Sequence, residues 1–365
     1  MNKYHYPQLD VFRALAALSV CAIHFNVDSF FYNHFANGLF VQLFFALSGF
    51  VIFLNYYGKI RNFIDLRFFI IKRFKRLYPL HLFFLIIFVL LEVLKYFFIL
   101  KYGYQSYTEA YSQNNLNNFL LNLFFLQHLA DFHTYNTPSW SISVEMMLYI
   151  TAGILFLFPK KYIVLVLIFY LLFFLYFFNN IYGATLSINA YLSGLYSFLI
   201  GCFFSYLYSK KKIIFKSLYF EFFYFIILFV FLSEIFYFKF IDKYYLYSIL
   251  FAFIFYLSCY LNKNSYLFKF IFNKFFNFLG KISYSIYLSH LFIFYALKQI
   301  LRFVFNHPTI EVDGAVVLDL TYFEANLLII ITYIVTIIFS HFVDSFFGHL
   351  NFVSSQEYWL CQAYL

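Results

Sequence analysis

The chain has 365 residues, of which 64% are hydrophobic and only 11% are charged. A soluble globular protein has about 25% charged residues, so this composition excludes a soluble protein and indicates an integral membrane protein. The formal net charge of +9 does not indicate nucleic acid binding, because the Lys and Arg residues lie between apolar segments, where they orient a membrane protein.

Apolar stretches of about 20 residues, the length that crosses a bilayer as a helix, recur from one end of the sequence to the other. We predict an all-α polytopic membrane protein that forms one domain over residues 1–365, without an appended soluble domain. Segment 116–130 is apolar but short and rich in Asn, so we expect it to lie in the interface or to re-enter the membrane. The ten predicted spans are 9–27, 38–57, 78–100, 138–158, 162–179, 187–208, 214–238, 244–262, 281–303 and 324–346.

The orientation of the spans follows from Lys and Arg, which are enriched in cytoplasmic loops. Most of the 25 Lys and Arg residues fall into alternate breaks between the predicted spans, starting with the N-terminal one. This distribution predicts that both termini are cytoplasmic. The four cysteines are scattered and form no CxxC pair, so neither a disulfide framework nor a metal site is predicted.

The first predicted span contains two ionisable residues, Arg13 and His24. A charged side chain at the centre of a bilayer costs about 2.5–3.5 kcal/mol on the insertion scale. The two residues are 11 positions apart, so they share one face of the helix and lie about 16 Å apart along it. Each alone fits a structural role, with Arg13 reaching the cytoplasmic headgroups and His24 bonding to a neighbouring carbonyl. Their common face favours a polar cavity.

A basic cluster of Lys72, Arg73, Lys75 and Arg76 lies at the cytoplasmic end of the third predicted span, which we expect Pro79 to begin. These residues form an anion site by charge, and the planar guanidinium group suits phosphate oxygens. The alternative is an ordinary basic anchor of the kind that orients membrane proteins.

The fourth predicted span contains a glutamate within the sequence TPSWSISVEMMLY. Pro138 starts a helix that descends from the outer side, and Glu145 then lies about 10 Å along it, near the depth of His24. We predict that Glu145 pairs with His24 and holds a neutral imidazole ready to accept a proton. The alternative is a structural hydrogen bond between Glu145 and a Ser or Tyr. Ser141 and Tyr149 are further candidate site residues in this motif.

Three weaker signals lie in other spans. His290 is near the middle of the ninth predicted span, among serines that suit helix packing. Ser48 and Gly49 are small enough to let another helix approach the second span closely. Glu92 and Lys95 are one turn apart near the outer end of the third span, which predicts a local ion pair.

Taken in chain order, these motifs resemble the membrane acyltransferase 3 family of mainly bacterial O-acyltransferases. The resemblance covers most of the chain. This sequence departs from the family's common pattern at Met146, where a second glutamate is usual, and at Ser289 and Leu291, which flank His290. The matching features are Arg13 and His24 at their spacing, LFFALSGF at 43–50, Arg73 and Arg76 followed by LYP, WSISVE at 140–145, GKISYSIYLSH at 280–290 and HFVDSFF at 341–347.

The resemblance implies the transfer of an acyl group, usually acetyl from cytoplasmic acetyl-CoA, to a sugar hydroxyl at the outer face of the inner membrane. The expected partners are acyl-CoA, a carbohydrate acceptor and the lipid bilayer, with no metal and no nucleic acid. We expect His24 to act on the acceptor hydroxyl or to carry the acyl group transiently, with Glu145 orienting it. The phosphates of the donor are expected to bind a basic site made of Arg13, Lys72, Arg73 and Arg76.

The main alternative function is a transporter or flippase. In that case Arg13, His24 and Glu145 would line a path for an anionic or glycan substrate without covalent chemistry.

Overall fold

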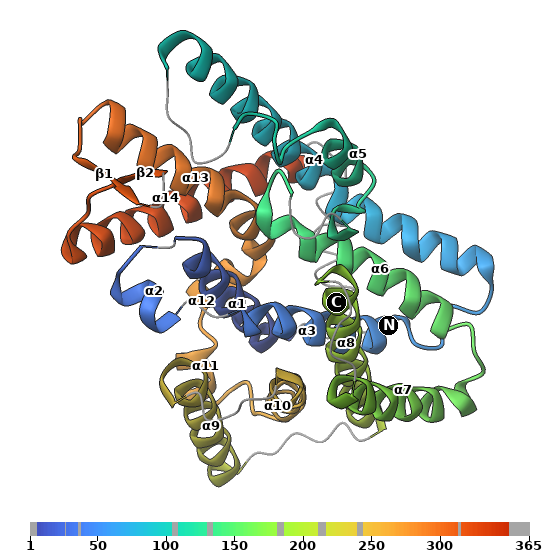
Figure 1. Cartoon of the computed structure of the whole chain (residues 1–365). Helices are drawn as coiled ribbons and strands as arrows, with labels where there is room; N and C mark the ends of the chain where they lie inside the picture. The colour runs from blue at the N-terminus through green and yellow to red at the C-terminus, as the bar shows by residue number, and fades with distance from the viewer. Residues whose placement is uncertain are drawn as a thin grey trace.

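The computed structural model describes residues 6–25, 27–35, 38–103, 109–129, 134–180, 186–210, 217–238, 244–312 and 315–349. Over these residues the chain is mostly α-helical and has one small β-hairpin (Figure 1). The α-helices are α1 (Pro7–Phe25), α2 (Phe30–Phe35), α3 (Leu39–Tyr56), α4 (Phe63–Tyr102), α5 (Leu116–Leu123), α6 (Trp140–Leu155), α7 (Lys160–Asn180), α8 (Leu186–Lys210), α9 (Leu218–Ser233), α10 (Tyr244–Ser258), α11 (Tyr266–Ile271), α12 (Lys274–Lys281), α13 (Ser283–Phe303) and α14 (Tyr322–His349). The remaining elements are the 3₁₀ helices η1 (Gln127–Leu129) and η2 (Thr137–Ser139), the π-helix η3 (Glu234–Phe238), and the strands β1 (Thr309–Val312) and β2 (Ala315–Leu318).

Six helices among the described residues are long and apolar enough to cross a bilayer. The other four predicted spans coincide with α6, α7, α10 and α13, which do not meet those limits of length and hydropathy over their described residues. An all-α polytopic membrane protein is therefore confirmed, whereas ten crossings and cytoplasmic termini stay predictions. The six candidate spans are Pro7–Phe25, Leu39–Tyr56, Phe63–Tyr102, Ala190–Lys210, Leu218–Phe236 and Tyr322–Gly348.

Large apolar side chains cover the outside of several helices. Phe222 and Phe229 on α9 and Ile334 on α14 are each more than half exposed. Soluble proteins rarely expose large contiguous apolar patches, so we assign these faces to contact with lipid.

Helix α4 corrects one prediction, because it runs without a break from Phe63 through Pro79 to Tyr102. We expected Pro79 to begin the span, since proline removes one backbone hydrogen bond and usually kinks or ends a soluble helix. In membrane proteins, neighbouring side chains satisfy the freed backbone groups. The carbonyl that Pro79 frees is that of Lys75, four residues earlier. Close by, the Tyr284 hydroxyl donates to the Leu77 carbonyl at 2.7 Å and joins α13 to α4. The basic cluster therefore lies on the same continuous helix as the span.

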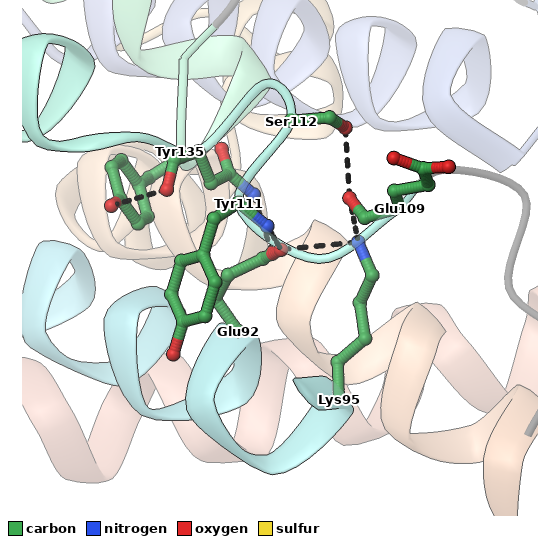
Figure 2. A network of polar contacts seen from close by, with 7 residues as sticks. Glu92, Lys95, Glu109, Tyr111, Ser112 and Tyr135 are labelled. Carbon is green, nitrogen blue, oxygen red and sulfur yellow. Dashed lines mark hydrogen bonds and ion pairs between the residues drawn. The ribbon is translucent and has the colours of Figure 1, made fainter. Parts of the chain in front are cut away.

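Beyond α4, the chain folds back onto the C-terminal half of that helix around the buried carboxylate of Glu92 (Figure 2). One carboxylate oxygen accepts from Lys95 Nζ at 3.1 Å and from the Tyr111 amide at 2.9 Å. The other accepts from the Asn114 side chain at 2.7 Å. The Tyr135 hydroxyl donates to the Asn114 carbonyl at 2.7 Å. The predicted ion pair of Glu92 and Lys95 is confirmed, and the same carboxylate also fixes a loop.

The segment predicted to lie in the interface or to re-enter contains α5, whose eight residues are too few to cross a bilayer. Asn118 and Asn122 of this helix are buried. The Asn122 side chain donates to the Asn118 carbonyl, and the Asn122 carbonyl lies 2.9 Å from the imidazole of His81 on α4. The asparagines that make the segment look polar thus bond within the protein.

Two helix crossings depend on glycine because the backbones meet directly. A Cβ atom on Gly49 of α3 would lie 1.9 Å from the carbonyl oxygen of Phe198 on α8, and one on Gly201 would lie 2.0 Å from the carbonyl oxygen of Ala46. A Cβ on Gly280 of α12 would lie 2.0 Å from the carbonyl oxygen of Asp10 on α1. This contact between α12 and α1 fixes the position of the part of α1 that carries Asp10 and Arg13.

Elements that the sequence did not predict lie between the long helices. Strands β1 and β2 form an antiparallel hairpin in which Thr309 faces Leu318 and Val312 faces Ala315. This hairpin joins α13 to α14, which pack side by side (Figure 1). The thiols of Cys21, Cys202 and Cys259 are free and buried, as expected for core residues, and Cys361 lies outside the described residues.

Candidate active site

A partly open cavity lies between α1, α3, α4, α6 and α13, with about 750 Å³ of space when the part open to solvent is included. Its apolar wall includes Val41, Phe44 and Leu77. Converging charged groups inside a membrane protein commonly mark a ligand site. The polar wall consists of three Arg, one Glu, three Ser and three Tyr side chains, which are Arg13, Ser48, Arg73, Arg76, Ser141, Glu145, Tyr149, Ser283, Tyr284 and Tyr287.

Arg73 is the most buried arginine of this cavity, with 1% of its surface exposed. Its Nη2 donates to the Tyr56 hydroxyl at 2.5 Å, and its guanidinium carbon lies 4.9, 5.7 and 5.8 Å from the ring centres of Tyr56, Phe69 and Tyr149. Its Nε and Nη1 atoms have no hydrogen-bond partner among the described residues. Because a guanidinium does not lose its proton and an unpaired buried charge is costly, the cavity is suited to an anion at this point.

Arg13 does not extend away from the protein as a simple headgroup anchor. Its Nη1 donates to the Asp10 carboxylate at 2.7 Å, and the side chain lines the cavity. Arg76 contributes a third guanidinium group to the same space. Among the described residues that line the cavity, the three arginines share the wall with one carboxylate, that of Glu145.

Glu145 corrects the predicted pairing with His24. One oxygen of its carboxylate accepts from the Ser48 hydroxyl at 2.8 Å and from the Tyr149 hydroxyl, one turn further along α6. Equal depth in the membrane does not bring two side chains together, because the rotation of each helix decides which neighbour it faces. The alternative of a Glu bond to Ser or Tyr is the arrangement found.

His24 instead lies beside His290, from α13, with ring centres 5.2 Å apart. His290 is 1% exposed, its Nδ1 lies 3.2 Å from the Ile286 carbonyl oxygen, and its Nε2 has no partner in the described part of the chain. Neither histidine lines the cavity. The two rings form a separate pair between α1 and α13.

Tyr287 connects the histidine pair to the cavity. Its ring lines the cavity and its centre lies 6.2 Å from that of His290. Its hydroxyl lies 2.6 Å from Ser141 Oγ and 3.0 Å from the Pro138 carbonyl oxygen. The start of α6 thereby fixes the aromatic ring that stands between the arginines and the histidines.

A family model described as an acyltransferase domain matches residues 6–352, which is nearly the whole chain. The chain belongs to the acyltransferase 3 family. Comparisons with curated proteins and with solved structures give no match. The protein is therefore a membrane acyltransferase, and the cavity with its adjoining histidine pair is its candidate active site.

Within this acyltransferase, the cavity brings together most of the residues that the sequence predicts for the site. Arg13, Arg73 and Arg76 share its wall with Glu145, Tyr149 and Ser141. Lys72 is half-buried on α4 but does not line the cavity. This position gives no support to its predicted role in donor binding.

Sequence reasoning missed the aromatic surroundings of Arg73 and the links made by Ser48 and Tyr287. Tyr56 and Phe69 carry no distinguishing signal in a chain that is 28% aromatic. Ser48 was assigned to helix packing alone, yet its hydroxyl donates to Glu145. The placement of Tyr287 one turn before His290 was the available signal for a link between the two parts of the site.

Proposed function

We propose that this membrane acyltransferase transfers an acyl group, most readily acetyl, from cytoplasmic acyl-CoA to a hydroxyl of a cell-surface or lipid-linked carbohydrate. Transfer takes place at the outer face of the inner membrane. The observation that carries the proposal is the continuity of the site. Three arginines line one cavity, and Tyr287 of the same cavity lies against His290, which contacts His24.

The basic part of the cavity supports binding of a phosphorylated donor. Coenzyme A carries phosphate groups at one end and the reactive thioester at the other. The unpartnered Nε and Nη1 of Arg73 provide two adjacent donors for phosphate oxygens, and Arg13 and Arg76 add charge. The apolar wall around Val41 and Leu77 suits the pantetheine arm, which then extends toward Tyr287.

The histidine end supports the transfer step. Acyl transfer from a thioester to an alcohol needs a base for the alcohol proton. In the direct route, His24 takes that proton while the alcohol oxygen bonds to the acyl carbon, the C–S bond breaks, and the coenzyme A thiolate leaves and is protonated. In the two-step route, a His24 nitrogen bonds to the acyl carbon, the C–S bond breaks and the coenzyme A thiolate leaves. The alcohol oxygen then bonds to the acyl carbon, the C–N bond breaks to restore the imidazole, and the alcohol proton passes through His24 to the thiolate.

Glu145 and Tyr149 belong to the donor end in this scheme. Tyr149 contributes one of the rings around Arg73 and donates its hydroxyl to Glu145, which Ser48 also holds. We infer that this chain of contacts fixes the ring beside Arg73, so its effect falls on donor binding rather than on the orientation of His24.

The test uses purified protein in lipid nanodiscs with radiolabelled acetyl-CoA and glycans extracted from the native cell surface. We expect labelled glycan and free coenzyme A in equal amounts, and a His24→Ala variant that still binds acetyl-CoA but forms no labelled glycan. A transporter would consume no thioester under these conditions. Full-rate glycan labelling by His24→Ala would contradict the role given to His24.

A further inference from the structure

The histidine beside His24 has a fixed protonation pattern. His290 Nδ1 lies 3.2 Å from the Ile286 carbonyl oxygen, which can only accept a hydrogen bond. The hydrogen of the neutral ring is therefore on Nδ1, and Nε2 carries a lone pair. That atom is buried and has no hydrogen-bond partner in the described part of the chain. A buried acceptor without a partner is costly, so its position beside His24 calls for an explanation.

The two imidazoles form no hydrogen bond in the structure, but their separation allows one to form after a rotation of the His24 ring. The ring centres lie 5.2 Å apart with an angle of 41° between the planes. Ring nitrogens stand about 1 Å out from the ring centre, so rings at this separation can bring one nitrogen of each to about 3 Å, the length of a hydrogen bond. Among the described residues, His24 makes a ring contact with His290 and no other polar contact.

We propose that His290 is a positioning residue for His24, accepting a hydrogen bond from the His24 ring on its Nε2 atom. This inference rests on the proposed function of His24. It assigns to a second imidazole the role that a carboxylate commonly has in catalytic triads, which is to fix the tautomer and orientation of the reacting histidine. Glu145 does not fill that role in the structure, since its carboxylate accepts hydrogen bonds from Ser48 and Tyr149 in the cavity wall.

The pairing serves both routes of acyl transfer. The His24 nitrogen that takes the alcohol proton, or attacks the thioester, must carry a lone pair, so the ring hydrogen must lie on the other nitrogen. A hydrogen bond to His290 Nε2 holds it there. When His24 takes up a proton or an acyl group, the N–H that faces His290 becomes a stronger donor. No proton passes to His290, and the proton taken by His24 is returned to the leaving thiolate.

Two conservative variants separate this role from a purely structural one. His290→Gln can place an acceptor at the position of Nε2, whereas His290→Asn can only replace the Nδ1 contact with the Ile286 carbonyl. We expect His290→Asn and His290→Ala to lower kcat for glycan acylation by about 100-fold. We expect His290→Gln to stay within about tenfold of the wild type, with the affinity for acetyl-CoA unchanged in all three.

The opposite order, with His290→Asn active and His290→Gln inactive, would overturn the proposal in favour of a structural role. Equal activity of all three variants would overturn it as well. Acetyl-CoA affinity, measured in nanodiscs, serves as the control for folding, because His290 does not line the donor cavity.

A second measurement does not depend on activity. Nitrogen-15 NMR of histidine-labelled protein reports the protonated nitrogen of each ring, and the His24→Ala and His290→Gln variants identify the two signals. We expect His290 to be protonated at Nδ1, and the His24 signal to shift when His290 is replaced by Ala. Protonation of His290 at Nε2 would exclude the pairing. If the pairing is found but wild-type protein acylates no glycan, the proposed function fails and the pairing stands.

Discussion

Two carboxylates of this acyltransferase, the buried one of Glu92 and the half-buried one of Glu145, differ in how their oxygens are bound. At Glu92 both oxygens are occupied, by Lys95, the Tyr111 amide and Asn114, and all donors come from the protein itself (Figure 2). At Glu145, one oxygen accepts both hydrogen bonds found among the described residues, and the carboxylate lines a cavity. Ionisable residues within a membrane protein can therefore serve the fold or a ligand.

The difference extends to the cations. Lys95 pairs with Glu92 and completes the cluster around that carboxylate, whereas the buried Nε and Nη1 atoms of Arg73 have no partners among the described residues. A charged group whose hydrogen bonds are complete stabilises the protein, and one whose hydrogen bonds are incomplete weakens it unless a ligand supplies the rest. Variants of the two regions should therefore separate loss of stability from loss of binding.

The largest effect is expected from Arg73→Gln. It removes the buried charge that we assign to donor phosphates, and we expect the affinity for acetyl-CoA to fall by at least about 100-fold, or about 2.7 kcal/mol. Isothermal titration calorimetry of the protein in nanodiscs measures this. The matched control is Arg67→Gln, an exposed arginine on the same helix outside the cavity, which should bind normally. Equal losses in both variants would point to general electrostatics.

The opposite pattern is expected from Glu92→Ala. It leaves the Tyr111 amide and the Asn114 side chain without their acceptor, at a cost of about 1–3 kcal/mol. We expect a lower thermal unfolding temperature and faster proteolysis of the loop at 109–115, with acetyl-CoA affinity unchanged. A variant of normal stability that binds acetyl-CoA poorly would show that Glu92 acts on the donor site.

A comparable loss is expected from Gly280→Ala, which tests whether the α1 position controls the cavity. The added Cβ would meet the Asp10 carbonyl oxygen, and overpacking of this kind costs about 1–3 kcal/mol. Because Asp10 pairs with Arg13, acetyl-CoA affinity should fall together with stability. Gly348→Ala is the control, since its Cβ meets nothing within 4 Å. Unchanged unfolding temperature and affinity in Gly280→Ala would contradict the close crossing.

The smallest effect is expected from Tyr149→Phe. The ring beside Arg73 remains, but the hydrogen bond to Glu145 is lost, which removes about 1.5–3 kcal/mol of local interaction, partly regained by Ser48. We expect acetyl-CoA affinity to fall by about threefold to tenfold, with kcat for glycan acylation nearly unchanged. A large fall in kcat instead would place Tyr149 with the histidine pair.

Much of the fold could be predicted from hydropathy, because each predicted span coincides with a helix. The continuation of α4 through Pro79 could not, since the local rule predicts that proline ends or kinks a helix, whereas membrane helices tolerate proline. The hairpin of β1 and β2 was also missed. Two strands of four residues are too short to give a clear pattern in a chain this apolar.

The sequence predicted which residues belong to the candidate site better than it predicted which of them contact one another. Arg13 and Glu145 were identified because ionisable groups are expensive in lipid, and Arg73 because it belongs to a basic cluster. All three line one cavity. The partner of Glu145 was predicted from depth alone and was wrong. Depth follows from the rise of 1.5 Å per residue, but the direction of a side chain around the helix axis has meaning only once the neighbouring helices are placed.

The sequence by itself determined that this is a helical membrane protein and which polar residues must be sheltered from lipid. Those properties depend on the transfer free energy of each segment and side chain, which is local. Only the tertiary structure decided which sheltered groups meet, with Glu145 held by Ser48 and Tyr149, and His24 beside His290. These side-chain contacts depend on how closely the helices pack. At Gly49 and Gly280 the backbones pack so closely that only glycine fits on the facing surface.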